Sequence, residues 1–300
     1  MNLEYLYKIE PYSLEKNKKS ELILTYLNNL TLFHYSNCWQ YKKILDSLDF
    51  NVELLNNIHE IPFLPVRLFK MFDLLSITKK EVIKTMTSSG TSGQDVSKIY
   101  LDKETSLNQS KALIKIVSDF TGLQRLPMLV IDTESVLKDR NLFSARGAGI
   151  LGFSIFASKR VFALDENMTL NIDDIMAFLD HNKGQKILLF GFTFMIYKYF
   201  IQALENNKIE FDLSNAILIH GGGWKKLINQ AVSANEFKEK LSNLCGINTV
   251  HDYYGMVEQT GSIYMECEYG NLHTSIFSDI IIRKAYDFSQ SPIGEKGIIQ

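Results

Sequence analysis

The sequence predicts an α/β protein with layered, mostly parallel sheets and flanking helices. Two patterns support this fold class. Short apolar runs of strand length recur between residues 126 and 250, and amphipathic segments with helical spacing separate them. Such alternation is typical of strand–helix–strand units, whose strands pair in parallel. Ligands bind beyond the carboxyl ends of the strands in these sheets, so a site is expected in the loops that leave them.

The predicted elements alternate along the chain. Residues 13–60 look helical and are interpreted as an N-terminal helical layer, which ends where Pro62 and Pro65 begin an extended segment. We therefore expect two domains, a helical layer over 1–60 and an α/β core over 61–300. The helices are expected at 102–120, 172–179, 194–204 and 227–244, and the strands at 127–132, 160–164, 186–190, 216–220, 247–250 and within 280–300.

Composition narrows the class of protein. The chain has 300 residues, of which 46% are hydrophobic, and a formal net charge of −2, so there is no electrostatic reason to expect nucleic acid or a membrane as a partner. Its three cysteines, Cys38, Cys245 and Cys267, show no CxxC spacing. This pattern argues against a disulfide scaffold or a zinc site. Together with the lack of a signal peptide at the start, it favours a cytoplasmic location.

A loop of glycine and hydroxyl residues lies between two apolar-alternating runs. Its members are Thr87, Ser88, Ser89, Gly90, Thr91, Ser92 and Gly93. Glycine allows the backbone to approach a ligand closely, and successive N–H groups in such a turn form a concave anion site. The same composition is also ordinary in a hairpin turn, so the loop alone leaves a phosphate cradle and a plain turn both open.

Two further loops follow later strands. The strand that ends at His220 leads into Gly221, Gly222, Gly223 and Trp224. Three consecutive glycines would let a flat ligand lie on bare backbone, although a tight strand-to-helix turn is the alternative. The next strand leads into Tyr253, Tyr254, Gly255 and Glu258. A glutamate after a glycine turn at a strand end is a candidate Mg²⁺ ligand, whereas a lone glutamate is more often a surface charge.

A dinucleotide-binding pattern, GxGxxG, occurs at residues 147–152. The segment before it is a poor buried strand and the segment after it has no clear helical face, so the context that the motif requires is missing. An NAD-dependent oxidoreductase is therefore disfavoured. The 87–93 loop also lacks the Gly-Lys-Ser/Thr ending of a Walker A sequence, and no GxSxG nucleophile elbow is present.

Together the three loops resemble the adenylate-forming superfamily of acyl- and aryl-CoA synthetases and luciferases. Residues 87–93 resemble its phosphate loop, 221–224 are similar to its adenine-side segment, and 254–258 resemble its Tyr-Gly-x-Thr-Glu motif. Within the superfamily, the chain looks like the LuxE-type acyl-protein synthetases of the bacterial fatty-acid reductase complex. The stretches that carry this likeness are 143–146, 189–194, 220–226 and 254–259.

The resemblance implies an activity and a set of site residues. ATP with Mg²⁺ would activate a carboxylic acid, here a long-chain fatty acid, to an acyl-adenylate, and the acyl group would pass to a protein thiol, with an acyl-reductase as a possible partner. Glu258 would bind Mg²⁺, and His220 would shape the acyl pocket or be a satisfied core histidine. The phosphate-binding residues would be Thr87 to Gly93, with Ser89 and Thr91 catalytic, and the adenine-side residues would be Gly221 to Trp224 and Tyr253 to Gly255.

The chain departs from the superfamily pattern in three places. Residues 94–97 stand where Pro-Lys-Gly is usual, and Val257 replaces the threonine of the Tyr-Gly-x-Thr-Glu motif. The ribose-binding acid and the small C-terminal lid with its acyl-accepting cysteine come later in the family than Gln300. We therefore expect a C-terminally truncated core without the lid domain. The alternative function is a catalytically incomplete nucleotide- or partner-binding module of a multi-enzyme complex.

Overall fold

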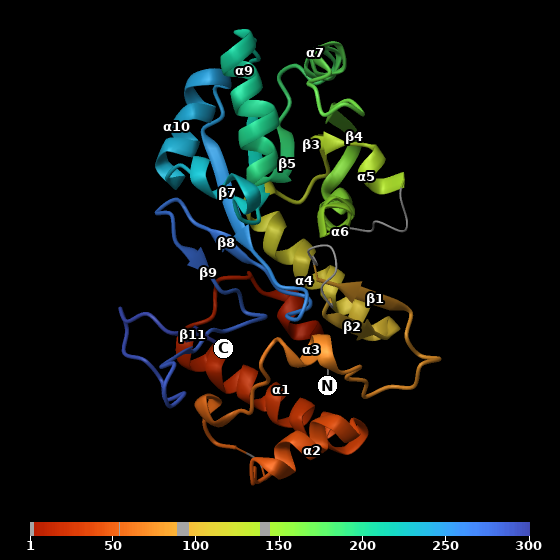
Figure 1. The fold of residues 1–300 in the computed structure, drawn as a ribbon, viewed down its shortest axis with the longest axis vertical. Coiled ribbons are helices and arrows are strands. Elements are labelled where there is room, and N and C mark those ends of the chain that lie inside the picture. Colours follow the sequence, from red (N-terminus) through yellow and green to blue (C-terminus); the bar gives the residue numbers. More distant parts are fainter. Residues whose placement is uncertain (1–2, 54, 89–95, 139–144) are drawn as a thin grey trace. The chain divides into compact units, whose positions relative to one another are not determined.

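The computed structural model describes residues 3–53, 55–88, 96–138 and 145–300 (Figure 1). The chain divides into two compact units, each built from several segments. Unit 1 comprises Met1–Ile116, Gly255–Ile263 and Thr274–Gln300, and unit 2 comprises Val117–Tyr254 and Tyr264–His273. The predicted domain boundary at residue 60 stays a prediction.

Unit 2 contains a seven-stranded sheet with the strand order β4-β3-β5-β6-β7-β8-β9. The first five strands in this order pair in parallel, and β8 and β9 add an antiparallel edge. The predicted mostly parallel sheet is confirmed. The bounds are β3 (Leu126–Thr133), β4 (Ala157–Leu164), β5 (Ile187–Phe192), β6 (Ala216–Gly221), β7 (Thr249–Tyr254), β8 (Tyr264–Glu266) and β9 (Leu272–His273).

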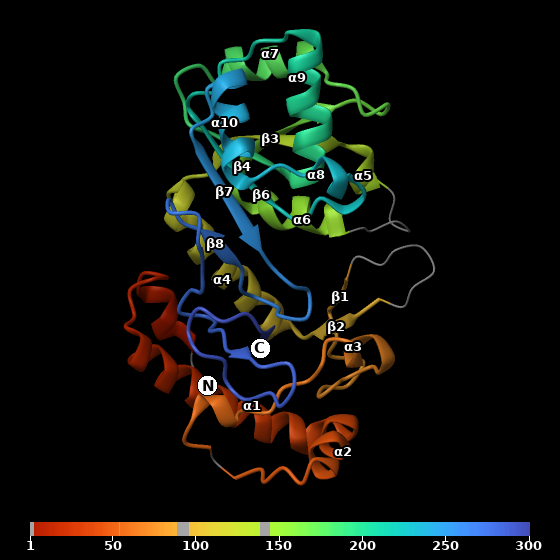
Figure 2. The same cartoon turned by 60° about the vertical axis from the view of Figure 1, so that its left-hand side comes forward.

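The core of unit 2 lies on both faces of its central strands. Every residue of β5 and β6 is buried, as expected for parallel strands covered on two sides. In Figures 1 and 2, α9 and α10 lie on one side of the strands and α6 lies on the other. The helical segments are α5 (Ser135–Lys138), α6 (Ala145–Phe153), α7 (Ile172–His181), α8 (Thr193–Met195), a π-helical stretch (Ile196–Ile201), α9 (Gln202–Asn207) and α10 (Ala234–Cys245).

Two sequence predictions in unit 2 are wrong in their limits. The helix expected over 227–244 is interrupted: residues Lys225–Gln230 form a 3₁₀ helix, Ala231 is extended, and α10 starts only at Ala234. The reason is local, because the Ser233 side chain accepts the Glu236 N–H at 3.2 Å and starts a new helix. The strand expected over 247–250 instead begins at Thr249 and continues to Tyr254.

Unit 1 is mainly helical, with two small antiparallel strand pairs. The helices predicted within residues 13–60 are present as α1 and α2, whereas the described residues between 48 and 57 are not helical. The bounds are η1 (Leu3–Lys8), α1 (Lys16–Asn37), α2 (Trp39–Ser47), η2 (Ile58–Glu60), α3 (Leu68–Met71), β1 (Lys84–Thr87), β2 (Lys98–Leu101), β10 (Ile282–Arg283) and β11 (Ile298–Ile299). Helix α4 (Lys103–Thr121) follows β2, and Asp102 caps it by accepting the Thr105 N–H at 2.7 Å.

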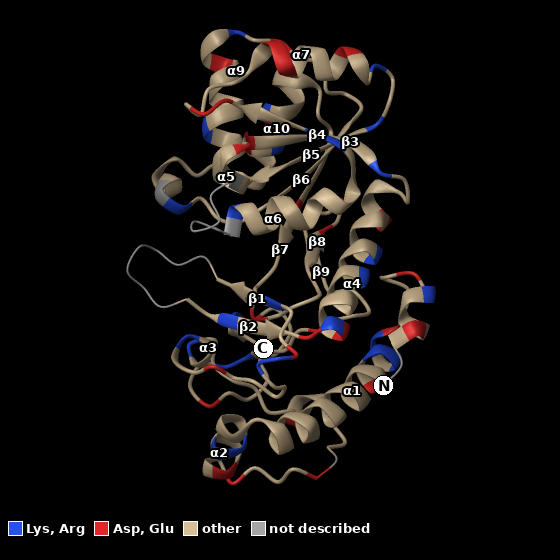
Figure 3. Cartoon of the chain, turned by 90° about the vertical axis from the view of Figure 1, so that its right-hand side faces the viewer, with Lys and Arg blue, Asp and Glu red and all other residues tan. Residues whose placement is uncertain are grey.

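A buried arginine holds the C-terminal segment of unit 1. Arg283 donates to the carbonyl oxygens of His59, at 2.6 Å, and Phe288, at 2.8 Å, and to the side chain of Gln300. The bond to His59 connects positions 224 residues apart in the chain. In α1 the charged side chains lie in the first turns, and the rest of the helix has no Lys, Arg, Asp or Glu (Figure 3). Among the described residues of the whole chain, none of the helices is both long and apolar enough to cross a membrane.

Candidate functional site

The candidate site in unit 2 lies at the carboxyl ends of β5, β6 and β7. These strands are parallel neighbours, so their last residues meet along one edge of the sheet. The edge carries the predicted residues His220 to Trp224, Tyr253 and Tyr254. The other described members of the predicted site, Thr87, Ser88, Gly255 and Glu258, belong to unit 1.

The three glycines after His220 have different structural roles. Gly221 ends β6 and is buried, and a Cβ atom added there would lie 2.6 Å from the ring of Tyr253. Gly222 has a φ of +78°, a conformation that disfavours side chains. Gly223 has open space where a Cβ would stand. Gly222 and Gly223 are exposed, so they present the bare backbone that a flat ligand requires.

The two tyrosines of β7 also differ, because one ring is packed in the core and the other is exposed. The Tyr253 ring packs at 5.0 Å from Phe153 and stacks at 6.3 Å on Phe190, and burial raises the pKa of its hydroxyl. Tyr254 is 40% exposed and stacks on Tyr264 with the ring centroids 6.0 Å apart. The sequence predicted that both tyrosines lie in the loop after a strand. That expectation is wrong because both residues pair with β8, at Met265 and Tyr264, which extends the strand.

His220 is a buried residue on the opposite face of the sheet. Its Nδ1 lies 2.9 Å from the Thr193 hydroxyl, which also donates to the Gly221 carbonyl at 3.3 Å. The threonine hydroxyl has one proton, so both bonds form together only if His220 Nδ1 is the donor. Burial lowers the pKa of His220 to about 4, which agrees with a neutral ring.

A small polar cavity of about 110 Å³ adjoins His220. Its wall includes Thr193, Ser233, Asp252 and Glu266. Burial, followed by the charge of Glu266, raises the pKa of Asp252 to about 6. The Asp252 Oδ1 lies 3.6 Å from His220 Nδ1, beyond hydrogen-bond length, and has no hydrogen-bond partner among the described residues. The wall of the cavity therefore includes one carboxylate oxygen, Asp252 Oδ1, that accepts no hydrogen bond from the described residues.

Glu266 was missed by sequence reasoning. It is buried on β8, where its carboxylate accepts the Lys238 ammonium at 2.8 Å and the backbone N–H of Asp252 at 2.9 Å. It therefore links α10 to the end of β7 and fixes the position of Asp252. Nothing in the local sequence indicates this role, since the pairing of β7 with β8 brings Glu266 to Asp252 and the position of α10 brings Lys238 to Glu266.

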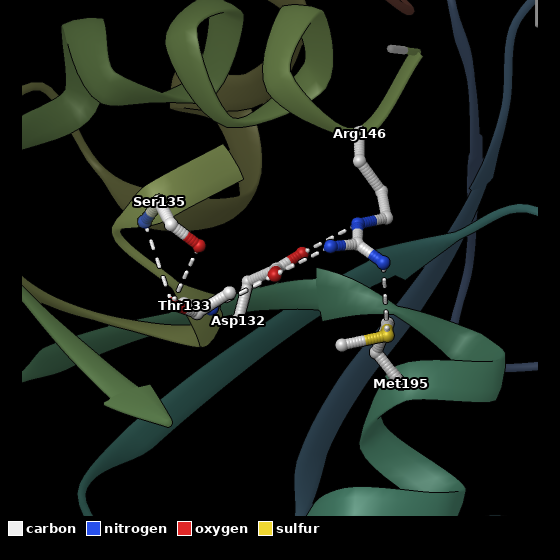
Figure 4. Close-up of polar contacts among 5 residues, drawn as sticks. All are labelled: Asp132, Thr133, Ser135, Arg146 and Met195. Atoms are coloured by element: carbon white, nitrogen blue, oxygen red, sulfur yellow. Dashed lines mark hydrogen bonds and ion pairs between the residues drawn. The ribbon is translucent and has the colours of Figure 1, made fainter. Parts of the chain in front are cut away.

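A second buried ion pair lies at the end of β3 (Figure 4). The Asp132 carboxylate accepts hydrogen bonds from Arg146 Nη2 at 3.1 Å and from the Thr133 N–H at 2.8 Å. Arg146 Nε lies 3.0 Å from the second carboxylate oxygen, an ion-pair distance without hydrogen-bond geometry. Burial raises the pKa of Asp132, while the charge of Arg146 opposes this shift. Sequence reasoning included Arg146 in a family-like stretch, 143–146, but assigned no role to it. Of that stretch, residues 143 and 144 lie outside the described residues.

The predicted phosphate loop begins at the end of a β-hairpin in unit 1. Strands β1 and β2 pair antiparallel, which confirms that the loop joins two strands. Ser88 fastens the start of this loop, since its side chain accepts the Ser97 N–H at 2.9 Å and its own N–H donates to the Ser97 carbonyl at 3.1 Å. The predicted residues Ser89, Gly90, Thr91, Ser92 and Gly93 lie outside the described residues. Their phosphate contacts stay predictions.

Glu258 follows the end of β7 and is half-buried in unit 1. Its carboxylate makes no hydrogen bond or ion pair with another described residue, so its oxygens are available to a cation. The described residues contain no cluster of three or more His, Cys, Asp or Glu that could hold a metal. Mg²⁺ commonly binds through one or two carboxylates with substrate phosphates, and a single free Glu258 fits that mode.

The dinucleotide-like glycines lie inside a helix. Gly147 and Gly149 belong to α6, and a Cβ on Gly149 would lie 2.9 Å from the Phe192 ring. The glycines therefore serve close packing of α6 on β5, not a turn between a strand and a helix. The pattern thus lacks the strand-to-helix context that a dinucleotide-binding motif requires, as the sequence predicted.

The fold matches that of solved ligase structures. It superposes on 2-hydroxyisobutyryl-CoA ligase in complex with 2-HIB-AMP and CoA in the thioesterification state with a TM-score of 0.72, at 14% identity over 96% of this chain and 60% of that chain. An open conformation of the same ligase gives a TM-score of 0.69 at 13% identity, over 96% of this chain and 66% of that chain. The fold is thus that of the adenylate-forming ligases.

The family is defined by sequence. The model of the family "Acyl-protein synthetase, LuxE" matches residues 3–300, and the chain belongs to this family. A long-chain-fatty-acid–luciferin-component ligase from Aliivibrio fischeri is 24% identical over 283 residues, covering 91% of this chain and 71% of that protein. Its counterpart from Vibrio harveyi is 24% identical over 274 residues, covering 87% and 69%. The predicted family, fold class and ligase class are confirmed.

Proposed function

We propose that this protein activates a long-chain fatty acid with ATP and passes the acyl group to a protein thiol. The family match over residues 3–300 carries this proposal. The names of the two relatives support the long-chain fatty acid as the acid. The chain spans 60–66% of the length of the 2-hydroxyisobutyryl-CoA ligase chains that share its fold, so the activity of the whole protein is proposed here for this chain.

In the first step, a carboxylate oxygen of the fatty acid would attack the α-phosphorus of ATP. A new P–O bond forms as the bond to pyrophosphate breaks, which yields acyl-adenylate and free pyrophosphate. Positioning and fixed hydrogen-bond donors supply most of the catalysis in such a step. The hydroxyls and N–H groups of Thr87 to Gly93 would hold the β- and γ-phosphates. Glu258 would hold Mg²⁺, which neutralises phosphate charge when bound.

The nucleotide base would lie on the exposed backbone of Gly222 and Gly223. Tyr254 offers an exposed ring at the end of the adjacent strand, which suits stacking with a flat base. Gly221, Trp224 and Tyr253 are better suited to supporting this surface. Tyr253 fills the space beside Gly221, and Trp224 packs against Tyr197 at 4.9 Å. His220 would border the acid pocket as a neutral ring.

In the second step, a thiolate would attack the acyl carbon and release AMP. The chain's own thiols are poor candidates for this role. Cys38 and Cys245 are buried, and burial raises the pKa of Cys245 to about 12, which suppresses its thiolate. We therefore propose that neither Cys38 nor Cys245 accepts the acyl group and that an acyl-reductase partner consumes it. The free state of all three cysteines supports a reducing compartment such as the cytoplasm.

The test is acid-dependent exchange of labelled pyrophosphate into ATP. Exchange should need the fatty acid and Mg²⁺ and should report the first step without any acyl acceptor. The length of the acid should be varied from octanoate to palmitate, with benzoate as an aryl comparison. No exchange with any of these acids, from protein that is folded by circular dichroism, would rule out the activity for this chain.

A second candidate is a nucleotide- or partner-binding module that lacks turnover. Its support is the exposed backbone of Gly222 and Gly223 near the exposed ring of Tyr254, which suits a flat base whether or not a reaction follows. Titration calorimetry with ATP distinguishes the two candidate functions. Binding of ATP without exchange would support the module, whereas exchange would exclude it.

A further inference from the structure

Two cationic side chains lie near the carboxyl edge of the parallel sheet of unit 2. They are Arg146, on α6, and Lys225, four residues after the end of β6. We propose that Arg146 and Lys225 form a binding site for an oxyanion, that is, for a carboxylate or a phosphoryl group. Both residues belong to the described part of unit 2, and neither was assigned a role from the sequence.

Asp132 holds one side of the Arg146 guanidinium, and the other side has no strong hydrogen-bond acceptor among the described residues. Asp132, whose side chain is only 1% exposed, accepts a hydrogen bond from Nη2 at 3.1 Å, and Nε lies 3.0 Å from its second oxygen. The remaining nitrogen, Nη1, faces the sulfur of Met195 at 3.7 Å. A thioether is a weak acceptor, so the N–H groups of Nη1 are poorly satisfied. An arginine fixed on one side by a carboxylate is prepared to bind an oxyanion with its other side.

Lys225 is held in an unusual backbone conformation. Its φ is +48°, a region that non-glycine residues seldom occupy and that marks sites where surrounding structure imposes the conformation. Its ammonium lies 4.9 Å from the ring centre of Phe194 and 5.9 Å from that of Phe192. Within the described part of the chain, this ammonium has no carboxylate partner. The fold therefore directs an uncompensated cation across two aromatic rings.

Phe192 connects the two cations. A Cβ on Gly149, one turn of α6 beyond Arg146, would lie 2.9 Å from Phe192 Cζ, and a Cβ on Gly222 would lie 3.0 Å from Phe192 Cδ1. The helix that carries Arg146 and the loop that carries Lys225 thus converge on one ring. The pKa of Lys225 is lowered, first by burial and then by the charge of Arg146, so the two cations repel each other. Asp132 balances one of them, and a bound anion would balance the second.

The identity of the anion rests on the proposed function. Acid activation brings together a carboxylate and a phosphoryl group, and either group could occupy this site. The 87–93 loop contains no lysine or arginine, so any positive side-chain charge that acts on the reactants beside Mg²⁺ comes from elsewhere in the chain. Arg146 and Lys225 would supply it by offsetting the negative charge that the two reactants bring together.

The test uses Trp224, the neighbour of Lys225, as a fluorescent reporter. The chain has two tryptophans, so Trp39→Phe, a change at an exposed position of unit 1, leaves Trp224 alone. In this background, pyrophosphate and sodium octanoate are titrated separately, with calorimetry as a second readout. Lys225→Gln should weaken binding of the true anion about tenfold, the size expected for one charge-assisted hydrogen bond.

Two further variants control for folding and for general charge. Arg146→Gln alone would leave Asp132 buried without its partner, so it is combined with Asp132→Asn, and the double variant should also weaken binding about tenfold. Lys198→Gln removes an exposed lysine of unit 2 that lies 4.8 Å from the Tyr199 ring but is not part of the site. Its affinity should stay within about twofold of the parent.

The outcomes separate this inference from the proposed function. Pyrophosphate binding that depends on Lys225 assigns the site to a phosphoryl group, and octanoate binding that depends on it assigns the site to a carboxylate. Either result supports the oxyanion site even if the protein performs no exchange reaction. Affinities unchanged in both site variants, equal weakening by Lys198→Gln, or no binding of either anion would overturn it.

Discussion

The ring of Tyr253 occupies the space that a side chain on Gly221 would need. A Cβ on Gly221 would lie 2.6 Å from Tyr253 Cε1, well inside van der Waals contact. The two residues are neighbours on the parallel strands β6 and β7. The first of the three glycines is therefore required by packing within the sheet, and only the next two are free to serve a ligand.

Gly221→Ala should accordingly destabilise the protein. Overpacking against a confined ring costs about 1–3 kcal/mol of the free energy of unfolding, which urea denaturation would measure. Gly223→Ala is the matched control, because open space surrounds its Cβ position and its φ is not positive. This control should unfold like the wild type yet weaken ATP binding if the base lies on that backbone. Equal stability of both variants would contradict the packing role of Gly221.

Glu266→Gln should destabilise unit 2 by about 2 kcal/mol, because it leaves the Lys238 charge without its buried partner. Glu205→Gln provides the comparison. It breaks an ion pair of similar length, 2.7 Å against 2.8 Å, with Lys240, which lies on the same helix as Lys238. The Glu205 side chain is 37% exposed, whereas that of Glu266 is 6% exposed. We expect a loss below about 1 kcal/mol there. Similar losses in urea denaturation of the two variants would show that burial of Glu266 contributes little.

The pair His220 and Asp252 predicts compensating pH effects. Between the lowered His220 pKa of about 4 and its ordinary 6.5, the unfolded state binds more protons, so acidification lowers stability. Between the ordinary Asp252 pKa of 3.8 and its raised value of about 6, the folded state binds more protons, so acidification raises stability. The two contributions have opposite signs over nearly the same range.

Asp252→Asn removes the second contribution and retains the first. The variant should therefore lose stability on acidification from pH 6.5 to 4 more steeply than the wild type, by at most about 1.4 kcal/mol per pH unit. Taking the difference between the two proteins cancels the titrating groups that do not interact with Asp252. Chemical denaturation at half-unit intervals would measure it. Parallel curves would show that Asp252 is ionised in the folded protein throughout this range.

Glu258→Gln should reduce acid-dependent pyrophosphate exchange at least about a hundredfold while leaving the unfolding curve unchanged. An amide retains the shape of the side chain but provides no charge to a cation. Raising the Mg²⁺ concentration should recover part of the activity, which a purely structural role would not allow. Glu295→Gln, at an exposed position of unit 1, should keep full exchange. Unchanged kinetics in Glu258→Gln would remove this residue from the metal site.

The sheet and its loops were largely predictable because their signals are local. The apolar runs of β5 and β6 indicate buried parallel strands, and the glycines after His220 mark the end of a strand. The motifs at 87–93, 221–224 and 254–258 were enough to indicate the family. Helix interruption at Ser233 was also a local signal, since a serine followed by Glu236 is a common start of a helix.

Other features depended on contacts between distant residues. The continuation of β7 to Tyr254 requires β8 beside it, and the roles of Glu266 and Arg146 arise from ion pairs with Lys238 and Asp132. Spacing along the chain carries no information about such pairs, because each depends on where separate elements pack. The sequence by itself thus determined the family, the strand alternation and the glycine-rich loops. Only the tertiary structure decided which glycine serves packing, which tyrosine is accessible and which cations converge at the sheet edge.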